Sequence, residues 1–263
     1  MKHLPNILTL GNLFCGCLAI AYLLTSQPYL FHNSADGSFR WVMGTEQIYF
    51  GTIFITLAAI FDMLDGFAAR ALNVHSPIGK DLDSLADVVS FGVAPSMVMF
   101  KCLWDAAMHE VNALDVNMLT LAPAFLIACF GALRLARFNI TSNEQKAYFI
   151  GMPIPAVGLF IGTFPLFIWN NSLYITKLLQ NKWMLYAIIG LMCFFMVSKI
   201  KFIKFLPPKI SMQTFWPQIV IIIGTLGSMI FIKSAAILVA FVLYVLLSLV
   251  YKYPETKTET NKQ

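Results

Sequence analysis

Long apolar segments recur along the whole chain, and they restrict the possible folds more than any other feature. Runs of about 18 or more apolar residues are typical of helices that cross a lipid bilayer. Only 12% of the residues are charged, about half the share of a soluble globular domain. The sequence therefore predicts an all-α polytopic membrane protein, with one membrane domain over residues 1–252 and a polar tail over 253–263. We place eight spans, near residues 7–25, 48–69, 79–101, 118–138, 153–170, 182–198, 215–232 and 234–251.

The lysines and arginines divide unevenly between the two sides of these spans. If the N-terminus is cytoplasmic, thirteen of the 18 lie in cytoplasmic loops, and the other five are Arg40, Lys101, Lys177, Lys182 and Lys233. Cytoplasmic loops of membrane proteins carry an excess of these residues. We therefore expect both termini in the cytoplasm, at the cell (inner) membrane. The net charge of +5 then indicates attraction to anionic lipids, and we expect no nucleic acid as a partner.

Several carboxylates interrupt the second and third apolar segments. An ionised aspartate inside a bilayer costs several kcal/mol and usually has a function. Ion pairs with Arg70 and Lys80 would not neutralise all of them once Asp81 is counted. Divalent cations would do so, and all-oxygen ligands favour Mg²⁺ or Mn²⁺, with Ca²⁺ as a further hard ion that a crystal could hold. The four aspartates concerned are Asp62, Asp65, Asp83 and Asp87.

The spacing of these aspartates predicts a single site. Asp62 and Asp65 are three residues apart and Asp83 and Asp87 are four apart, so each pair shares one helix face. The two helices form an antiparallel hairpin. At about 1.5 Å of rise per residue, Asp62 and Asp87 both lie roughly 12 Å from the cytoplasmic helix ends, and Asp65 and Asp83 roughly 6–8 Å. The pairs should therefore face each other near the cytoplasmic interface.

The residues next to the acids are small or basic. Gly66, Ala69 and Gly79 could allow close helix packing, or they could leave room for the phosphates of a ligand. Arg70 could bind such a phosphate through its forked donors.

Together these residues form the pattern Asp62-x-x-Asp65-Gly66-x-x-Ala69-Arg70, eight residues, Gly79-x-x-x-Asp83-x-x-x-Asp87. At every position it resembles the signature of the CDP-alcohol phosphotransferases, integral membrane enzymes of phospholipid synthesis. The resemblance implies a core of six membrane helices, two divalent metal ions, and a CDP-linked donor whose pyrophosphate lies on the metals. It also implies that Asp62, Asp65 and Asp83 are metal ligands. Asp87 would be a ligand or the catalytic base that deprotonates the acceptor hydroxyl.

Three further stretches resemble the phosphatidylserine synthase branch of that family: LPNILTLGNLFCG, DSLADVVSFGVAPS, and RLARFN with YFIGMPIPA. With the core pattern, the resemblance covers roughly the first 160 residues. It implies CDP-diacylglycerol as the donor and L-serine as the acceptor, with phosphatidylserine and CMP formed by metal-assisted direct displacement. We do not expect a covalent histidine intermediate, because none of the four histidines belongs to an H-x-K pair.

Other polar residues are candidates for binding the substrates. Arg134 and Arg137 share a helix face near the cytoplasmic end of the fourth span, where they could anchor the helix at the headgroups. Alternatively, Arg134, Arg137 and Lys146 could bind the serine carboxylate or a lipid phosphate. Asn6, Thr9 and Asn12 on the first span could bind the cytosine or ribose, although Asn6 could equally cap that helix.

Two other functions stay open at this stage. A synthase of the same family could use glycerol 3-phosphate, inositol phosphate or choline, although a phosphorylated acceptor would require a second cluster of cations. An ion-coupled transporter also holds acids within the membrane, but nearer the midplane than these acids lie. We also expect a homodimer surrounded by membrane lipids.

Overall fold

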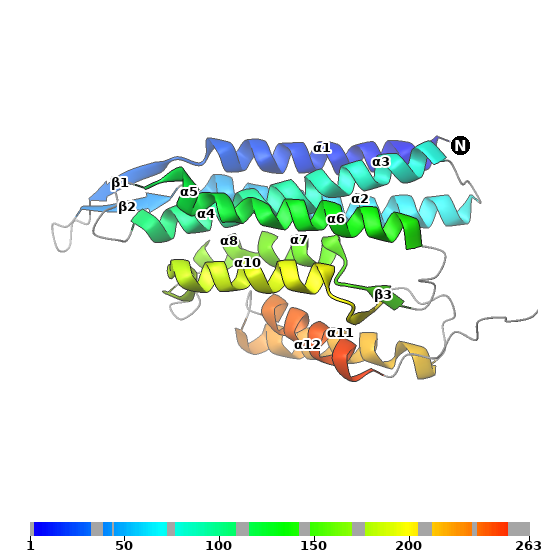
Figure 1. Cartoon of the computed structure of the whole chain (residues 1–263). Coiled ribbons are helices and arrows are strands. Elements are labelled where there is room, and N and C mark those ends of the chain that lie inside the picture. Colours follow the sequence, from blue (N-terminus) through cyan, green and yellow to red (C-terminus); the bar gives the residue numbers. More distant parts are fainter. Residues whose placement is uncertain are drawn as a thin grey trace, which may run out of the picture.

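The computed structural model describes residues 3–32, 39–43, 45–72, 77–108, 116–141, 148–169, 177–204, 212–232 and 236–251. Within these ranges the chain is predominantly helical, and the long helices lie side by side along a common direction (Figure 1). A helical segment covers each of the eight predicted spans. The predicted all-α polytopic fold is therefore confirmed.

The first half of the chain forms the longest helices. Four stretches are long and apolar enough to cross a membrane: Leu4–Thr25, Glu46–Ala71, Ile78–Met108 and Met118–Thr141. The last two are composite rods, in which a π-helical or 3₁₀ segment joins two α-helices. The elements are α1 (Leu4–Thr25), α2 (Thr45–Ala71), α3 (Pro77–Asp87), the π-helix η1 (Val88–Val93), α4 (Ala94–Met108), α5 (Met118–Leu121), the 3₁₀ helix η3 (Ala122–Phe125) and α6 (Leu126–Thr141).

The second half contains shorter apolar segments of 10–17 residues. Its helices are α7 (Ile154–Gly162), α8 (Phe164–Trp169), α10 (Lys182–Val197), α11 (Met212–Ile232) and α12 (Ala236–Val250). The break that the sequence predicts at residues 232–234 lies between α11 and α12.

Two short antiparallel two-stranded sheets lie at opposite ends of the helices (Figure 1). The first pairs β1 (Pro28–His32) with β2 (Phe39–Met43), and the second pairs β3 (Tyr148–Ile150) with β4 (Lys201–Ile203). The pairing of β4 with β3 buries Phe202 and Ile203 in the protein core and leaves Lys201 exposed.

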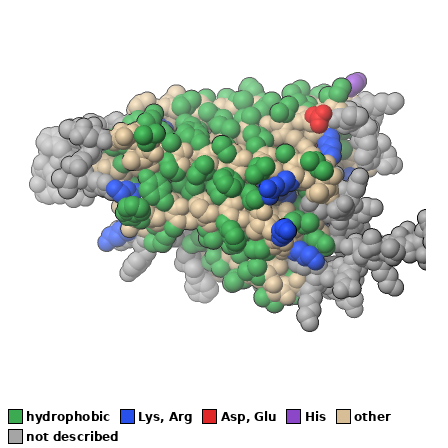
Figure 2. Space-filling view, in the orientation of Figure 1, with side chains coloured by type: hydrophobic (Ala, Val, Ile, Leu, Met, Phe, Trp, Pro, Cys, Tyr) green, Lys and Arg blue, Asp and Glu red, His purple; other side chains and the backbone are tan. Residues whose placement is uncertain are grey.

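The core surrounds α4, in which every residue from Ala94 to Leu103 is buried. The outer surface is also apolar. Large side chains such as Phe14, Phe67 and Ile223 are more than half exposed, and Figure 2 shows hydrophobic side chains across the middle of one face. In a membrane protein such a surface contacts lipid, as the composition predicts.

The π-helix η1 begins directly after Asp87 and has the closest backbone packing around the acids. A Cβ atom at Gly16 of α1 would lie 2.9 Å from the Cα of Ser90. A Cβ at Gly158 of α7 would lie 2.8 Å from the Cα of Phe91. Glycine at these positions therefore lets α1 and α7 approach η1 and hold the helix that carries Asp87.

This packing generates a stability prediction. Gly158→Ala places a methyl group against the Phe91 backbone, so we expect it to lower the stability by about 1–3 kcal/mol, as overpacking does. The measurement is the thermal unfolding temperature in detergent. Gly190→Ala on α10 is the matched control, because its Cβ would meet nothing within 4 Å and alanine favours a helix. Equal unfolding temperatures for the two variants would contradict the close packing.

Candidate active site

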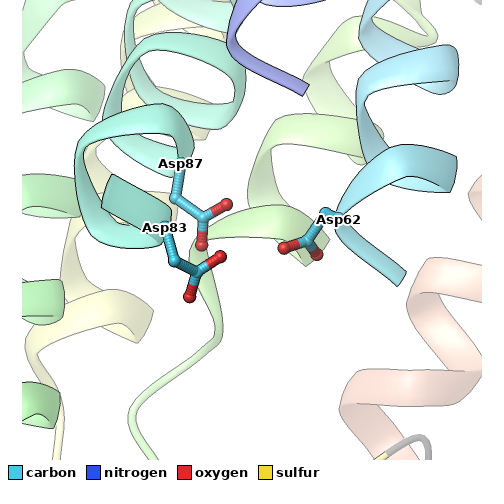
Figure 3. Close-up of side chains that lie close together, drawn as sticks. All are labelled: Asp62, Asp83 and Asp87. Atoms are coloured by element: carbon cyan, nitrogen blue, oxygen red, sulfur yellow. The ribbon is translucent and has the colours of Figure 1, made fainter. Parts of the chain in front are cut away.

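Three carboxylates meet between α2 and α3 (Figure 3). Asp62 extends from α2 toward Asp83 and Asp87 on α3, and one oxygen of each lies within 4.8 Å of the others. Asp87 is buried, and the other two are half-buried. The structure thus brings together three of the four aspartates that the sequence identifies as candidate ligands. One comes from α2 and two come from α3.

The fourth aspartate, Asp65, lies outside this group of three. It is buried, its Oδ2 atom has no hydrogen-bond partner among the described residues, and its carboxylate interacts with Thr9 of α1. Its charge nevertheless acts on Asp62, Asp83 and Asp87, so Asp65 lies near the group of three. Asp62 lies opposite both acids of α3, and Asp65 contacts Thr9 of α1.

The donor set of the cluster fits a divalent metal ion. Asn12 of α1 donates from Nδ2 to Asp87 Oδ1 at 3.4 Å, but a neutral amide does not compensate the charge of three acids. Carboxylates this close repel one another unless they are protonated or a cation lies among them. Oxygen ligands of this kind are those that Mg²⁺ and Mn²⁺ prefer. Asp62, Asp83 and Asp87 are therefore the residues that could hold such an ion.

The space beside the cluster is open at Gly66. A Cβ there would meet none of the described residues within 4 Å, so packing against this part of the chain does not require a glycine at this position. Gly79 and Ala69 are half-buried, and Arg70 is exposed, with its Nε donating to the Gly66 carbonyl at 2.9 Å. At Gly66, the structure therefore favours room for a ligand over close helix packing.

The two arginines of α6 have different surroundings. Arg134 is 4% exposed, whereas Arg137 is exposed. The two residues are three apart on one continuous α-helix, but Arg134 packs into the protein and Arg137 lies at the surface. The predicted Lys146 lies outside the described residues.

Arg134 lies in an aromatic setting next to the acid cluster. Its Cζ is 5.0 Å from the ring centroid of Phe138 and 5.4 Å from that of Phe149. Its Nε and Nη2 atoms have no hydrogen-bond partner among the described residues, although its charge interacts with Asp87 and Tyr244. Aromatic faces stabilise a buried cation only in part, and unpaired donors are costly. Arg134 is therefore suited to bind an anion beside Asp87.

A hydrogen-bonded chain connects α6 to α3. Lys80 Nζ donates to the Asn139 carbonyl at 3.0 Å, and Asn139 Nδ2 donates to Ser84 Oγ at 2.8 Å. These contacts hold the helix of Arg134 beside the helix of Asp83 and Asp87. We had given Asn139 no role, although its position within the RLARFN stretch was a usable signal.

Helix α1 supplies polar groups to the same region. It begins at Leu4 after the N-cap residue His3, with Pro5 in its first turn, so the alternative that Asn6 caps the helix is wrong; proline favours a helix start at this place. Thr9 is buried and donates to the Pro5 carbonyl at 3.0 Å, and Asn6 is half-buried. The contact of Asn12 with Asp87 was not predicted. The position of Asn12, a polar residue within an apolar helix, could have indicated it.

The acid cluster predicts a direct effect on metal binding. Asp62→Asn and Asp83→Asn each remove one anionic ligand, so we expect each to weaken Mn²⁺ binding at least tenfold, measured by titration of the purified protein. Asp81→Asn on the same helix is the control, because Asp81 is exposed and lies outside the group of three. Unchanged Mn²⁺ affinity in both cluster variants would contradict the site.

Comparison with known proteins is consistent with this geometry. The CDP-alcohol phosphatidyltransferase family model matches residues 2–197. The CDP-diacylglycerol–serine O-phosphatidyltransferase of Bacillus subtilis is 34% identical over 205 residues, which cover 78% of this chain and 92% of that protein. The enzyme of that name from Helicobacter pylori is 31% identical over 212 residues, covering 80% and 76%.

A more similar but shorter match comes from an archaeon. The CDP-diacylglycerol–serine O-phosphatidyltransferase of Methanocaldococcus jannaschii is 40% identical over 161 residues, which cover 61% of this chain and 67% of that protein. The family model covers well over half of the chain and includes the whole acid pattern. The chain is therefore a membrane-embedded transferase of phospholipid synthesis and belongs to the CDP-alcohol phosphatidyltransferase family.

Proposed function

We propose that this enzyme transfers the phosphatidyl group of CDP-diacylglycerol to the hydroxyl of L-serine and forms phosphatidylserine and CMP. The observation that carries the proposal is the buried Arg134 guanidinium beside Asp87 of the acid cluster, with two donor nitrogens that have no hydrogen-bond partner among the described residues. An acceptor with both a hydroxyl and a carboxylate would contact both groups. The relatives named for a serine reaction support the same choice.

We propose that Asp62, Asp83 and Asp87 bind Mg²⁺ or Mn²⁺, with Asp65 as a ligand of a second ion. When bound, the ions would neutralise the pyrophosphate of the donor and the leaving CMP. The donor would enter beside Gly66, Ala69 and Gly79, where Gly66 has free space around it. Arg70 would bind a donor phosphate, and Asn6 and Thr9 of α1 would contact the nucleotide.

In the reaction, Asp87 accepts the proton of the serine hydroxyl. The hydroxyl oxygen attacks the β-phosphorus of CDP-diacylglycerol, and a new oxygen–phosphorus bond forms. The bond between that phosphorus and the CMP oxygen breaks, and CMP leaves with its electron pair. Asn12 positions the base, because its amide donates to Asp87 Oδ1.

For the acceptor, we propose that Arg134 binds the serine carboxylate. The exposure of Arg137 favours its alternative role as an anchor at the lipid headgroups. Lys146 remains a proposed acceptor-binding residue. We further propose that both termini and the active site lie on the cytoplasmic side of the inner membrane, and that the enzyme is a homodimer.

The decisive assay for the function compares acceptors. Purified enzyme receives CDP-diacylglycerol and Mn²⁺ with serine, glycerol 3-phosphate, inositol 1-phosphate or choline, one at a time, and the lipid product and CMP are quantified. We expect product from serine and none after chelation by excess EDTA. Robust product from another acceptor and none from serine would contradict the proposal.

The role of Arg134 gives a separate kinetic prediction. Loss of a charged hydrogen bond to an anion costs about 1.5–3 kcal/mol, roughly ten- to a hundredfold in binding. We expect Arg134→Ala to raise the serine KM by that factor and to change the CDP-diacylglycerol KM little. Arg137→Ala is the control and should change neither. A rise confined to the donor KM would assign Arg134 to the lipid phosphate.

A further inference from the structure

A second cation lies near Arg134, from a part of the chain to which we had assigned no catalytic role. Lys204 follows β4, and its Nζ lies 4.8 Å from the ring centroid of Phe149, the ring that Arg134 also contacts. Burial, together with the charge of Arg134, lowers the pKa of Lys204. Two positive groups therefore lie close enough to repel each other around one aromatic side chain.

The proximity of these two cations favours an anionic ligand. Like charges in a partly buried setting destabilise each other, and Arg134 is almost fully buried with Nε and Nη2 unpaired among the described residues. A carboxylate or a phosphate bound between the two cations would offset the repulsion and accept hydrogen bonds from both. The geometry therefore favours an oxyanion as the ligand of the Arg134–Lys204 pair.

The backbone on both sides of Lys204 is held by the last two helices. From α12, Tyr244 donates through its hydroxyl to the Ile203 carbonyl at 3.2 Å, and Ser248 Oγ accepts from the Ile203 amide at 3.2 Å. From α11, Gln218 Nε2 donates to the Lys204 carbonyl at 2.8 Å. Both helices, and β4 itself, follow residue 197, where the family model ends.

We propose that Lys204 is a specificity-determining residue that binds the serine carboxylate together with Arg134, and that α11 and α12 hold it at the acceptor site. The inference rests on the proposed function, since it requires serine to be the acceptor. It gives the C-terminal part of the chain, beyond the family domain, a defined task. A phosphate of the donor has the same oxyanion chemistry, and the kinetics below separate the two ligands.

The experiment measures the KM of serine and of CDP-diacylglycerol for Lys204→Ala, Lys204→Arg and Lys201→Ala. We expect Lys204→Ala to raise the serine KM about ten- to a hundredfold, with less than a twofold change for the donor. Lys204→Arg keeps the charge and should restore most of the affinity. Lys201→Ala removes an exposed lysine from β4, the strand that precedes Lys204, and should leave both KM values unchanged. If Lys204→Ala unfolds, Lys204→Met keeps the side-chain stem on Phe149 and replaces it in the comparison.

Each possible result has one meaning. A donor KM that rises while the serine KM stays constant would place a lipid phosphate on Lys204 and overturn the proposal, as would wild-type kinetics in Lys204→Ala. Failure of the proposed function would look different, because the wild-type enzyme itself would then make no product from serine.

Ser248→Ala tests whether α12 positions Lys204. The substitution removes one hydrogen bond to the Ile203 amide and leaves every charge in place. We expect a severalfold rise in the serine KM that disappears in the Lys204→Ala background, because positioning matters only when the ammonium is present. Effects that add fully in the double variant would show that Ser248 acts on stability alone and would remove α12 from the acceptor site.

Discussion

The mutual repulsion of Asp62, Asp83 and Asp87 is the constraint on which the site depends. One carboxylate oxygen of each lies within 4.8 Å of the others inside a largely apolar helix bundle. Such a group cannot stay ionised without positive charge among its members. The fold crowds the three acids together, and in our proposal a bound cation compensates their charge and attracts the phosphates of the donor.

The surrounding helices keep this unfavourable arrangement in place. Helix α1 packs against both α2 and α3, and its Asn12 donates a hydrogen bond to Asp87. Gly16 and Gly158 allow α1 and α7 to approach η1 closely. On the other side, the chain of contacts through Asn139 holds α6 next to α3. Arg134 therefore lies beside Asp87, and a negative site and a positive site adjoin each other.

Much of this architecture could be predicted from local sequence. The eight apolar runs identify the helices, and the three- and four-residue spacings bring Asp62, Asp83 and Asp87 to one place. The rotation of each helix about its axis could not be predicted, because it depends on packing. That rotation brings Asp65 into contact with Thr9 of α1, and it buries Arg134 while Arg137 is exposed. Lys204 was missed for another reason: it reaches Phe149 through the pairing of β3 with β4, strands more than 50 residues apart in sequence.

The central claim is that the three carboxylates of α2 and α3 hold the metal on which the chemistry depends. Anomalous diffraction from crystals of the active enzyme grown with Mn²⁺ tests it most directly. The account predicts a manganese peak bounded by the carboxylates of Asp62, Asp83 and Asp87. Manganese bound elsewhere in the enzyme, with no peak between these three side chains, would contradict it.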